Sequence, residues 1–265
     1  MRHETIDGVV VRSYDNGDNN RYLSILTAEK GRITLLAKGS HSLRGEQRPI
    51  SQLFTYANFE YYRRGEIDIL KGGSPIQSFY ELSEDMDSIN LATYLCEVVC
   101  ELTDEGIEAQ EMLRMVLNSF YAIANRRYPN EQIKGTFEFR AAVLSGYEPT
   151  LTVCTRCGKA IEGNAIYLDV MNGGVVCADC MRKSASLTLP QEDASRNAQT
   201  LCPLSQAALA ALRYAAVAPL SRLFSFELID QEDQRLFSTA AETYLLSHVG
   251  HGFRTLDFYR EMKGL

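Results

Sequence analysis

Four of the seven cysteines in this 265-residue chain form two Cys-x-x-Cys pairs, Cys154 with Cys157 and Cys177 with Cys180. Nineteen residues separate the pairs, and two β-like runs, AIYLDV and GVV, flank a Gly-Gly turn between them. The segment can therefore fold back as a hairpin and bring the pairs together. Four thiolates at this spacing are typical of a tetrahedral Zn²⁺ site, and four protein ligands leave no open position for catalysis. We expect one structural zinc ion.

Two other interpretations of the pairs are a redox dithiol and buried thiols without a ligand. A redox dithiol calls for a single Cys-x-x-Cys opening a helix beside a βαβ unit, and neither interpretation accounts for two pairs at this spacing. The other three cysteines, Cys96, Cys100 and Cys202, lie in or beside apolar helical pattern. We expect them to be core residues and not ligands.

The pattern of apolar residues changes near residue 80. Before it, short runs rich in β-branched and aromatic residues alternate with Gly, Asn and Asp turns, which predicts strands at 8–14, 21–27, 32–38, 54–62 and 66–71. After it, apolar residues recur at three- and four-residue steps. These steps predict helices at 91–102, 113–124, 131–145, 204–217 and 240–249. Gly146 and Pro149 mark the end of the third helix.

Charge and hydropathy limit the possible partners and location. No apolar run approaches the ~20 residues needed to span a bilayer, and the start lacks the apolar core of a signal peptide. With unpaired, reduced cysteines this favours the cytoplasm. The net charge is −7, but residues 1–80 hold 11 Lys and Arg against 9 Asp and Glu, whereas residues 81–150 hold 5 against 13. The acidity is therefore regional, and the first segment is mildly basic.

The sequence contains no obvious catalytic site. There is no Walker-type loop, no G-x-S-x-G and no H-E-x-x-H. The carboxylates concentrate in stretches such as ELSEDMD and ELTDEGIEAQE, which are typical of solvated helix faces, and only four histidines are present. We expect a protein that is not an enzyme.

The order of several segments is specific enough to compare with a known family. The chain reads GVVVRSYDNGD, LTAEKGRITLLAKG and FEYYRRGEIDILK, then FEFRAAVLSGYEPTLTVCTRCG and a closing GHGFRTLDFYREM. This order resembles the RecO family of bacterial recombination-mediator proteins over nearly the whole chain. The most specific parts are residues 27–39, 137–158 and 254–258.

The resemblance implies an α+β multidomain fold. It places a five-stranded OB-fold barrel at 1–80, a helical domain at 81–150, a zinc-binding insert at 151–184 and the rest of the helical domain at 185–265. The independent count of five strands agrees with an OB-fold, whose open face often carries oligonucleotides.

The resemblance also implies a function in DNA repair and homologous recombination. RecO-like proteins bind single- and double-stranded DNA and anneal strands coated with single-stranded-DNA-binding protein. Together with RecR they help load RecA. The chain would then act in a bacterial cytoplasm and on the nucleoid.

Phosphate contacts need Lys or Arg along a groove, and aromatic rings offer stacking faces for bases. The candidate cations are Arg12, Arg21, Lys30, Arg32, Lys38, Arg44, Arg48, Arg63 and Arg64, with His41 beside them. Lys38, Arg44 and Arg48 are the strongest because they follow a strand in a polar, Gly-containing loop. The candidate stacking residues are Tyr56, Phe59, Tyr61 and Tyr62.

The resemblance further implies that the helical region binds the acidic, Phe-ended tail of single-stranded-DNA-binding protein. Such a tail needs an apolar pocket with a cation at its rim. Lys134 and Arg140, near Phe137 and Phe139, are the candidates, although Arg140 can also pair with Glu138. A zinc-containing scaffold that binds only proteins, without DNA, is the alternative function.

Overall fold

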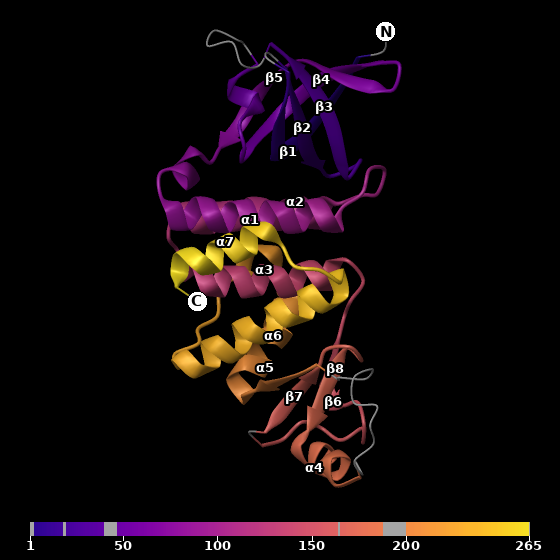
Figure 1. Cartoon of the computed structure of the whole chain (residues 1–265), viewed down its shortest axis with the longest axis vertical. Helices are drawn as coiled ribbons and strands as arrows, with labels where there is room; N and C mark the ends of the chain where they lie inside the picture. The colour runs from indigo at the N-terminus through magenta and orange to yellow at the C-terminus, as the bar shows by residue number, and fades with distance from the viewer. Residues whose placement is uncertain (1–2, 18–19, 40–46, 164, 188–199, 265) are drawn as a thin grey trace. The chain divides into compact units, whose positions relative to one another are not determined.

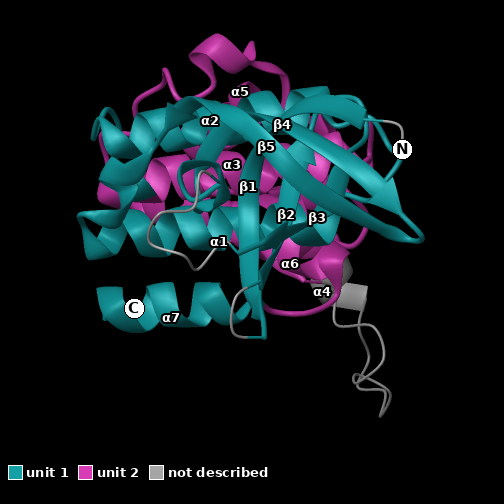
Figure 2. Cartoon of the chain, turned by 90° about the horizontal axis from the view of Figure 1, so that it is seen from above, with its two compact units in different colours: residues 1–130, 253–265 teal, residues 131–252 magenta. Residues whose placement is uncertain are grey.

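A computed structural model describes residues 3–17, 20–39, 47–163, 165–187 and 200–264. The chain forms two compact units, which Figure 2 distinguishes by colour. Unit 1 joins Met1–Asn130 to Phe253–Leu265, and unit 2 is Glu131–Gly252. Unit 1 is therefore built from two stretches of sequence that unit 2 separates.

Unit 1 begins with a ring of five strands (Figure 1). The strands are β1 (His3–Asn16), β2 (Asn20–Thr27), β3 (Arg32–Lys38), β4 (Thr55–Arg64) and β5 (Ile67–Ser78). They pair in the order β1-β2-β3-β5-β4, and β4 returns to β1. All pairings are antiparallel except the short β3–β5 seam, where two residue pairs join in parallel. This is the partly open, five-stranded arrangement of an OB-fold, and the predicted barrel is confirmed.

Alternation along the strands separates a buried from an outward face. Leu23 and Ile25 on β2, and Ile33, Leu35 and Ala37 on β3, belong to the barrel core. Because side chains alternate along a strand, the even-numbered residues of β2 and β3 point away from that core. The register then fixes which residues of β1 share the outward face.

Gly31 is required at the turn between β2 and β3. Its φ of +61° lies in the left-handed region, and an added Cβ would lie 2.1 Å from the Asp104 carbonyl oxygen. The Arg32 amide donates to that same oxygen. Only glycine allows this close approach of the turn to the loop after the first helix.

Two helices lie side by side against the barrel in unit 1, as Figure 1 shows. They are α1 (Met86–Leu102) and α2 (Gln110–Ala124). Asp85 caps α1, because its side chain accepts from the Ser88 amide. Phe120 of α2 packs edge-on against Phe54 and Phe79, with ring centroids 5.2 and 5.6 Å apart. Short 3-10 turns occur at η1 (Pro49–Ser51) and η2 (Tyr80–Ser83).

The last helix, α7 (Arg254–Lys263), completes unit 1 by packing against α1. The Lys263 ammonium lies 2.7 Å from the Asp87 carboxylate at one end of the pair. At the other end Thr255 donates to Glu97, and the Phe253 ring packs edge-on against Tyr94. The two helices are therefore antiparallel.

Unit 2 combines helices with a four-stranded sheet. Its elements are α3 (Asn130–Leu144), β6 (Thr150–Cys154), β7 (Ile166–Asp169), β8 (Gly174–Cys177), α4 (Ala178–Leu187), β9 (Leu201–Leu204), α5 (Gln206–Val217), η3 (Leu220–Arg222) and α6 (Gln231–Val249). The sheet order is β6-β8-β7-β9. Helix α6 packs against β9 and α5, and Phe237 of α6 lies over Gly135 of α3.

The structure confirms the hairpin between the cysteine pairs and corrects the starts of two predicted helices. Leu204 ends strand β9, so the helix predicted from that residue begins at Gln206. Helix α6 starts nine residues before the predicted Ala240, because its first turns are polar and lack an apolar repeat. Strands β6 and β9 and helices α4 and α7 were not predicted. No helix within the described ranges is both long and apolar enough to cross a bilayer.

Candidate metal centre and nucleic-acid interface

The four paired cysteines converge in unit 2. The sulfur atoms of Cys154, Cys157, Cys177 and Cys180 all lie within 4.8 Å of one another. The Cys157 and Cys177 sulfurs are 3.9 Å apart. A tetrahedral zinc with ~2.3 Å bonds places its sulfurs roughly 3.8 Å apart, which is close to this distance. The sulfur set therefore fits a four-coordinate metal ion.

Local backbone geometry brings the two pairs together. Strand β6 ends at Cys154 and pairs with β8, with Cys154 opposite Val175. The Gly158 amide closes a tight turn onto the Cys154 carbonyl at 2.8 Å, and its φ of +71° suits glycine. Cys177 ends β8, and Cys180 lies in the first turn of α4. The helix N-terminus adds a favourable field for thiolates.

Hydrogen bonds give the sulfurs unequal acidity. Burial acts to raise the pKa of Cys154, but amide donors from Cys177, Arg156 and Cys157 outweigh it and lower the pKa to about 6. Hydrogen bonding to Cys157, with burial, raises the pKa of Cys180 to about 12. Without a cation, Cys154 therefore ionises readily while Cys180 keeps its proton. All four cysteines can become thiolates together only if a cation lies among them. The cluster can hold a metal ion, and its closed ligand set favours a structural one.

Other cysteines lie apart from the cluster, as expected. Cys96 is buried in α1 and Cys202 is buried in β9, and burial raises the pKa of each thiol. Cys100 is half-buried. None of the three joins the metal-ligating group found among the described residues.

The candidate cations of the barrel divide into paired and unpaired groups. Arg63 is held by Asp68 through two 2.8 Å hydrogen bonds, and Lys30 contacts Glu4 and Tyr61. Arg21 pairs with Asp15, and Arg32 donates to the Thr103 carbonyl. Among described residues, no hydrogen bond or ion pair engages Arg12, Lys38, Arg48 and Arg64, all of which are exposed. Arg44 and His41 lie outside the described residues.

An aromatic pair, in which Tyr14 is exposed and Tyr22 is half-buried, lies on the same outward face as two of these unpaired cations. Tyr14 and Tyr22 face each other across β1 and β2, with ring centroids 5.3 Å apart and planes at 27°. Arg12 lies two residues before Tyr14, and Lys38 lies diagonally across from Tyr22 on β3. Arg12, Tyr14, Tyr22 and Lys38 are hereafter called the β1–β3 patch. The outward positions are 12, 14 and 16 on β1, 20, 22 and 24 on β2, and 34, 36 and 38 on β3, and none of them carries an acid. Asp15 alternates with these positions and pairs with Arg21.

Two of the predicted stacking residues point into the barrel and cannot reach a base. Phe59 and Tyr61 belong to the barrel core and are buried. Tyr56 and Tyr62, on the opposite face of β4, are only half-buried. In the sequence, Tyr14 lies two residues after Arg12, and Tyr22 directly follows Arg21. This closeness of tyrosine to arginine was the signal that could have indicated the Tyr14–Tyr22 pair.

The two residues proposed for tail binding lie in the interior. Lys134 is 3% exposed and contacts Glu138 at 2.8 Å and Glu242 at 2.6 Å. Arg140 is 9% exposed and donates to the Ala216 carbonyl. The expected pairing of Arg140 with Glu138 is replaced by this backbone contact and by the Lys134–Glu138 pair. Neither side chain therefore lies at an exposed pocket rim.

Comparison with known proteins gives this chain a family. The family model described as "Recombination protein O N terminal" matches residues 1–79, and the model described as "Recombination protein O C terminal" matches residues 83–257. DNA repair protein RecO of Acetivibrio thermocellus is 24% identical over 262 residues, or 99% of this chain and 98% of the relative. The protein of the same name from Clostridium acetobutylicum is 26% identical over 230 residues, or 87% and 86%. The chain belongs to the RecO family of DNA repair proteins.

Proposed function

We propose that this protein is a recombination mediator that binds single- and double-stranded DNA and anneals complementary strands. The β1–β3 patch carries the proposal. It offers unpaired cations to phosphates and the exposed Tyr14 ring, stacked on the half-buried Tyr22, to bases, and the outward strand positions around them carry no acid. It lies on strands 2 and 3 of the barrel and on the strand beside them, and OB-folds commonly bind oligonucleotides on this face.

Two further candidate cations are available to DNA. Arg48 and Arg64 are exposed and unpaired among the described residues, and Arg44 belongs to the same candidate set. Lys30, Arg32 and Arg63 are already engaged by protein groups, so we assign them minor roles in DNA binding. The protein has no proposed catalytic residue.

The cysteine cluster supports a structural role for a single Zn²⁺ ion. Cys154, Cys157, Cys177 and Cys180 would be its ligands, and the metal would hold the two turns of the insert together. No step in DNA binding depends on it.

The family suggests partners for the rest of the molecule. We propose that the protein works with RecR and with the tail of single-stranded-DNA-binding protein, and that it helps load RecA in the cytoplasm, at the nucleoid. Lys134 and Arg140 remain the residues first proposed for the tail. Their burial in unit 2 does not favour that placement.

A salt titration of oligonucleotide binding and annealing tests the proposal. Three or four phosphate contacts predict a slope of about 2 to 3 log units of affinity per log unit of salt on single strands. Lys38→Glu with Arg48→Glu should stop annealing and lower the slope by about 1.4. The matched control, Arg114→Glu with Arg235→Glu, makes the same charge change on helices α2 and α6, outside the barrel strands, and should leave annealing and the slope unchanged.

Two results would overturn the proposal. If the parent protein retains no DNA at low salt, the protein-binding scaffold replaces the mediator. If the barrel variant anneals as well as the control variant, the DNA surface lies elsewhere.

A further inference from the structure

Helix α4 buries none of its described side chains. At positions 178–183 every side chain is exposed or half-buried, and the whole helix has ten residues. Helices shorter than about 12–15 residues are marginal in water unless tertiary contacts hold them. Helix α4 therefore needs an attachment other than apolar burial.

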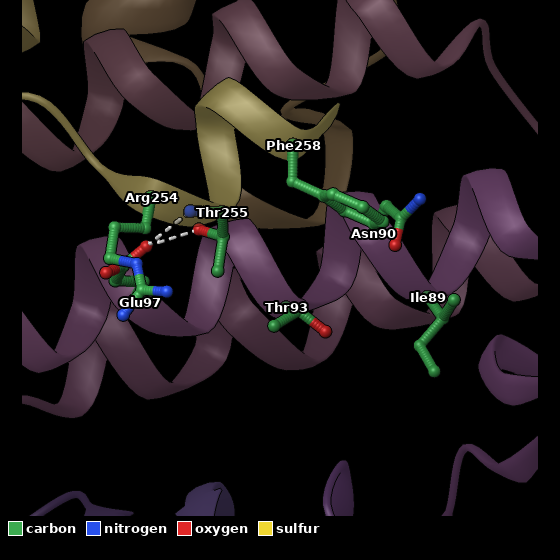
Figure 3. Close-up of a pocket in the computed structure, with 7 residues that line it drawn as sticks. All are labelled: Ile89, Asn90, Thr93, Glu97, Arg254, Thr255 and Phe258. Atoms are coloured by element: carbon green, nitrogen blue, oxygen red, sulfur yellow. Dashed lines mark hydrogen bonds between the residues drawn. The ribbon is translucent and has the colours of Figure 1, made fainter. Parts of the chain in front are cut away.

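Helix α7, which also has ten residues, shows the common kind of attachment. Its Leu256 and Tyr259 side chains are buried. The amide and the hydroxyl of Thr255 both donate to Glu97 of α1 (Figure 3). Burial and hydrogen bonds to a neighbouring helix thus hold α7 in place.

Cys180 supplies the attachment of α4. This residue lies in the first turn of the helix, and its sulfur is within 4.8 Å of the other three sulfurs of the cluster. The Arg182–Asp179 ion pair, in contrast, stays within the helix. A zinc ion held by the cluster therefore ties α4 to strands β6 and β8, which end in Cys154 and Cys177.

The four cysteines of the cluster differ in exposure. Cys154 is buried, and its sulfur accepts from the Cys177 amide at 3.4 Å. Cys177 and Cys180 are half-buried, whereas Cys157 is exposed. Oxidation of zinc-ligating thiolates follows their exposure, because the oxidant has to reach the sulfur. A peroxide in solution therefore reaches Cys157 first.

A second sulfur lies within reach of Cys157. The Cys177 sulfur is 3.9 Å away, and a disulfide needs about 2 Å. Cys177 is fixed at the end of β8, where it is paired with Ile166 of β7. Cys157 lies in the turn after β6, so a shift of this turn closes the bond.

We propose that the cluster is a peroxide-sensitive attachment, in which a disulfide between Cys157 and Cys177 abolishes the metal site and releases α4. This inference rests on the structural zinc proposed above and concerns the regulation of that site. It does not involve the DNA surface of the barrel.

The oxidation balances with one molecule of hydrogen peroxide. The Cys157 thiolate attacks one peroxide oxygen, so that an S–O bond forms, the O–O bond breaks and hydroxide leaves. The Cys177 thiolate then attacks the Cys157 sulfur, so that an S–S bond forms, the S–O bond breaks and a second hydroxide leaves. The two thiolates lose two electrons in total, and the peroxide gains them.

The disulfide changes what holds the helix. It leaves two thiolates, Cys154 and Cys180, where a structural zinc site needs four ligands. The metal tie on Cys180 is lost, and no buried side chain at positions 178–183 replaces it. The new bond joins the Cys157 turn to β8, so we expect the β7–β8 hairpin to persist. Oxidation thus frees one helix and spares the sheet.

Treatment of the zinc-loaded full chain with hydrogen peroxide tests the proposal. A chromogenic zinc chelator should record about one zinc released for each Cys157–Cys177 disulfide, which peptide mapping by mass spectrometry identifies. In hydrogen-exchange mass spectrometry the α4 amides should exchange about tenfold faster or more, while α7 and β7 stay unchanged. A thiol reductant with added zinc should restore the slow exchange.

Two further samples separate the metal from the disulfide. Removal of zinc by EDTA under reducing conditions should free α4 to the same extent, because the tie is then lost without oxidation. Cys100→Ser removes a cysteine outside the cluster and should release zinc at the same peroxide concentration as the parent chain.

Each of the following results would overturn the inference. A main disulfide within one Cys-x-x-Cys pair would show that oxidation takes another route. Unchanged exchange of α4 after zinc loss would show that the helix has another attachment. Zinc retained while Cys100 is oxidised would show that the cluster is not the peroxide-sensitive group. A chain purified without zinc would overturn the zinc proposal as well, whereas any of the other results with a zinc-loaded chain contradicts this inference alone.

Discussion

Lys134 shows how one residue can be misjudged from sequence. A lysine near apolar residues suggested a cation at a pocket rim, but the side chain is enclosed by two carboxylates from α3 and α6. Burial acts to lower its pKa, but Glu138 and Glu242 outweigh burial and raise it. Lys134 therefore remains charged, and its stabilisation is complete below pH 10.5 and is lost as the pH rises beyond.

Removing that cation should be costly. Lys134→Met removes the buried ammonium that contacts both Glu138 and Glu242, so we expect the free energy of unfolding to fall by about 3–5 kcal/mol. Urea denaturation at pH 7 measures it. Replacing Glu138 and Glu242 by Leu in the same chain should restore much of the loss, and the control Lys159→Met should lose little. A Lys134→Met protein as stable as the parent would show that the two carboxylates do not need the ammonium.

At the scale of single elements, the barrel strands were predictable and the short elements were not. Each barrel strand has at least seven residues and contains a run rich in β-branched and aromatic residues bounded by turn residues, so the strand can be recognised in the sequence. Strands β6 and β9 have five and four residues, too few for a pattern. Helix α7 packs against α1 and buries only Leu256 and Tyr259, so its apolar repeat is short. The cysteine spacing identified the metal-ligating group because the ligands stand close in sequence.

Tyr14 offers a test of base stacking that is separate from phosphate binding. Tyr14→Ala should weaken single-strand binding about tenfold or more at every salt concentration, since stacking contributes about 1–3 kcal/mol per base. The salt slope should not change, because no charge is lost. Tyr14→Phe should bind as the parent does, and Tyr80→Ala, an exposed tyrosine outside the patch, serves as control. A change of slope in Tyr14→Ala would contradict the stacking role.

The cysteine insert should depend on its metal. Elemental analysis of protein purified without chelator should find about one zinc per chain. Cys177→Ser should lose the zinc and the thermal stability of the insert, because metal binding supplies folding free energy. Cys100→Ser lies outside the cluster and should keep both. Oligonucleotide binding by the barrel should survive Cys177→Ser; its loss would show that the metal does more than hold the insert.

Across the whole molecule, unit 1 depends on a helix encoded after unit 2. Leu256 and Tyr259 of α7 are 1% and 0% exposed. A chain that stops after Gly252 should therefore lose protection of the α1 amides in hydrogen-exchange mass spectrometry, while α5 and β7 keep theirs. Leu256→Ala should also increase hydrogen exchange of the α1 amides, to a lesser degree, and Glu261→Ala should leave that exchange unchanged. Unchanged exchange in α1 of the shortened chain would show that α1 does not need α7.

The interruption of unit 1 also sets the order of events on the ribosome. At roughly 5–20 residues per second, about 6 to 24 s separate the synthesis of Asn130 from that of Phe253. During that interval α1 exists without the helix that later covers it, while the cysteine turns are already translated. During synthesis, unit 2 can therefore fold before unit 1 is complete. In that stage the side of α1 that α7 later covers is exposed, and it is the surface that a chaperone would contact.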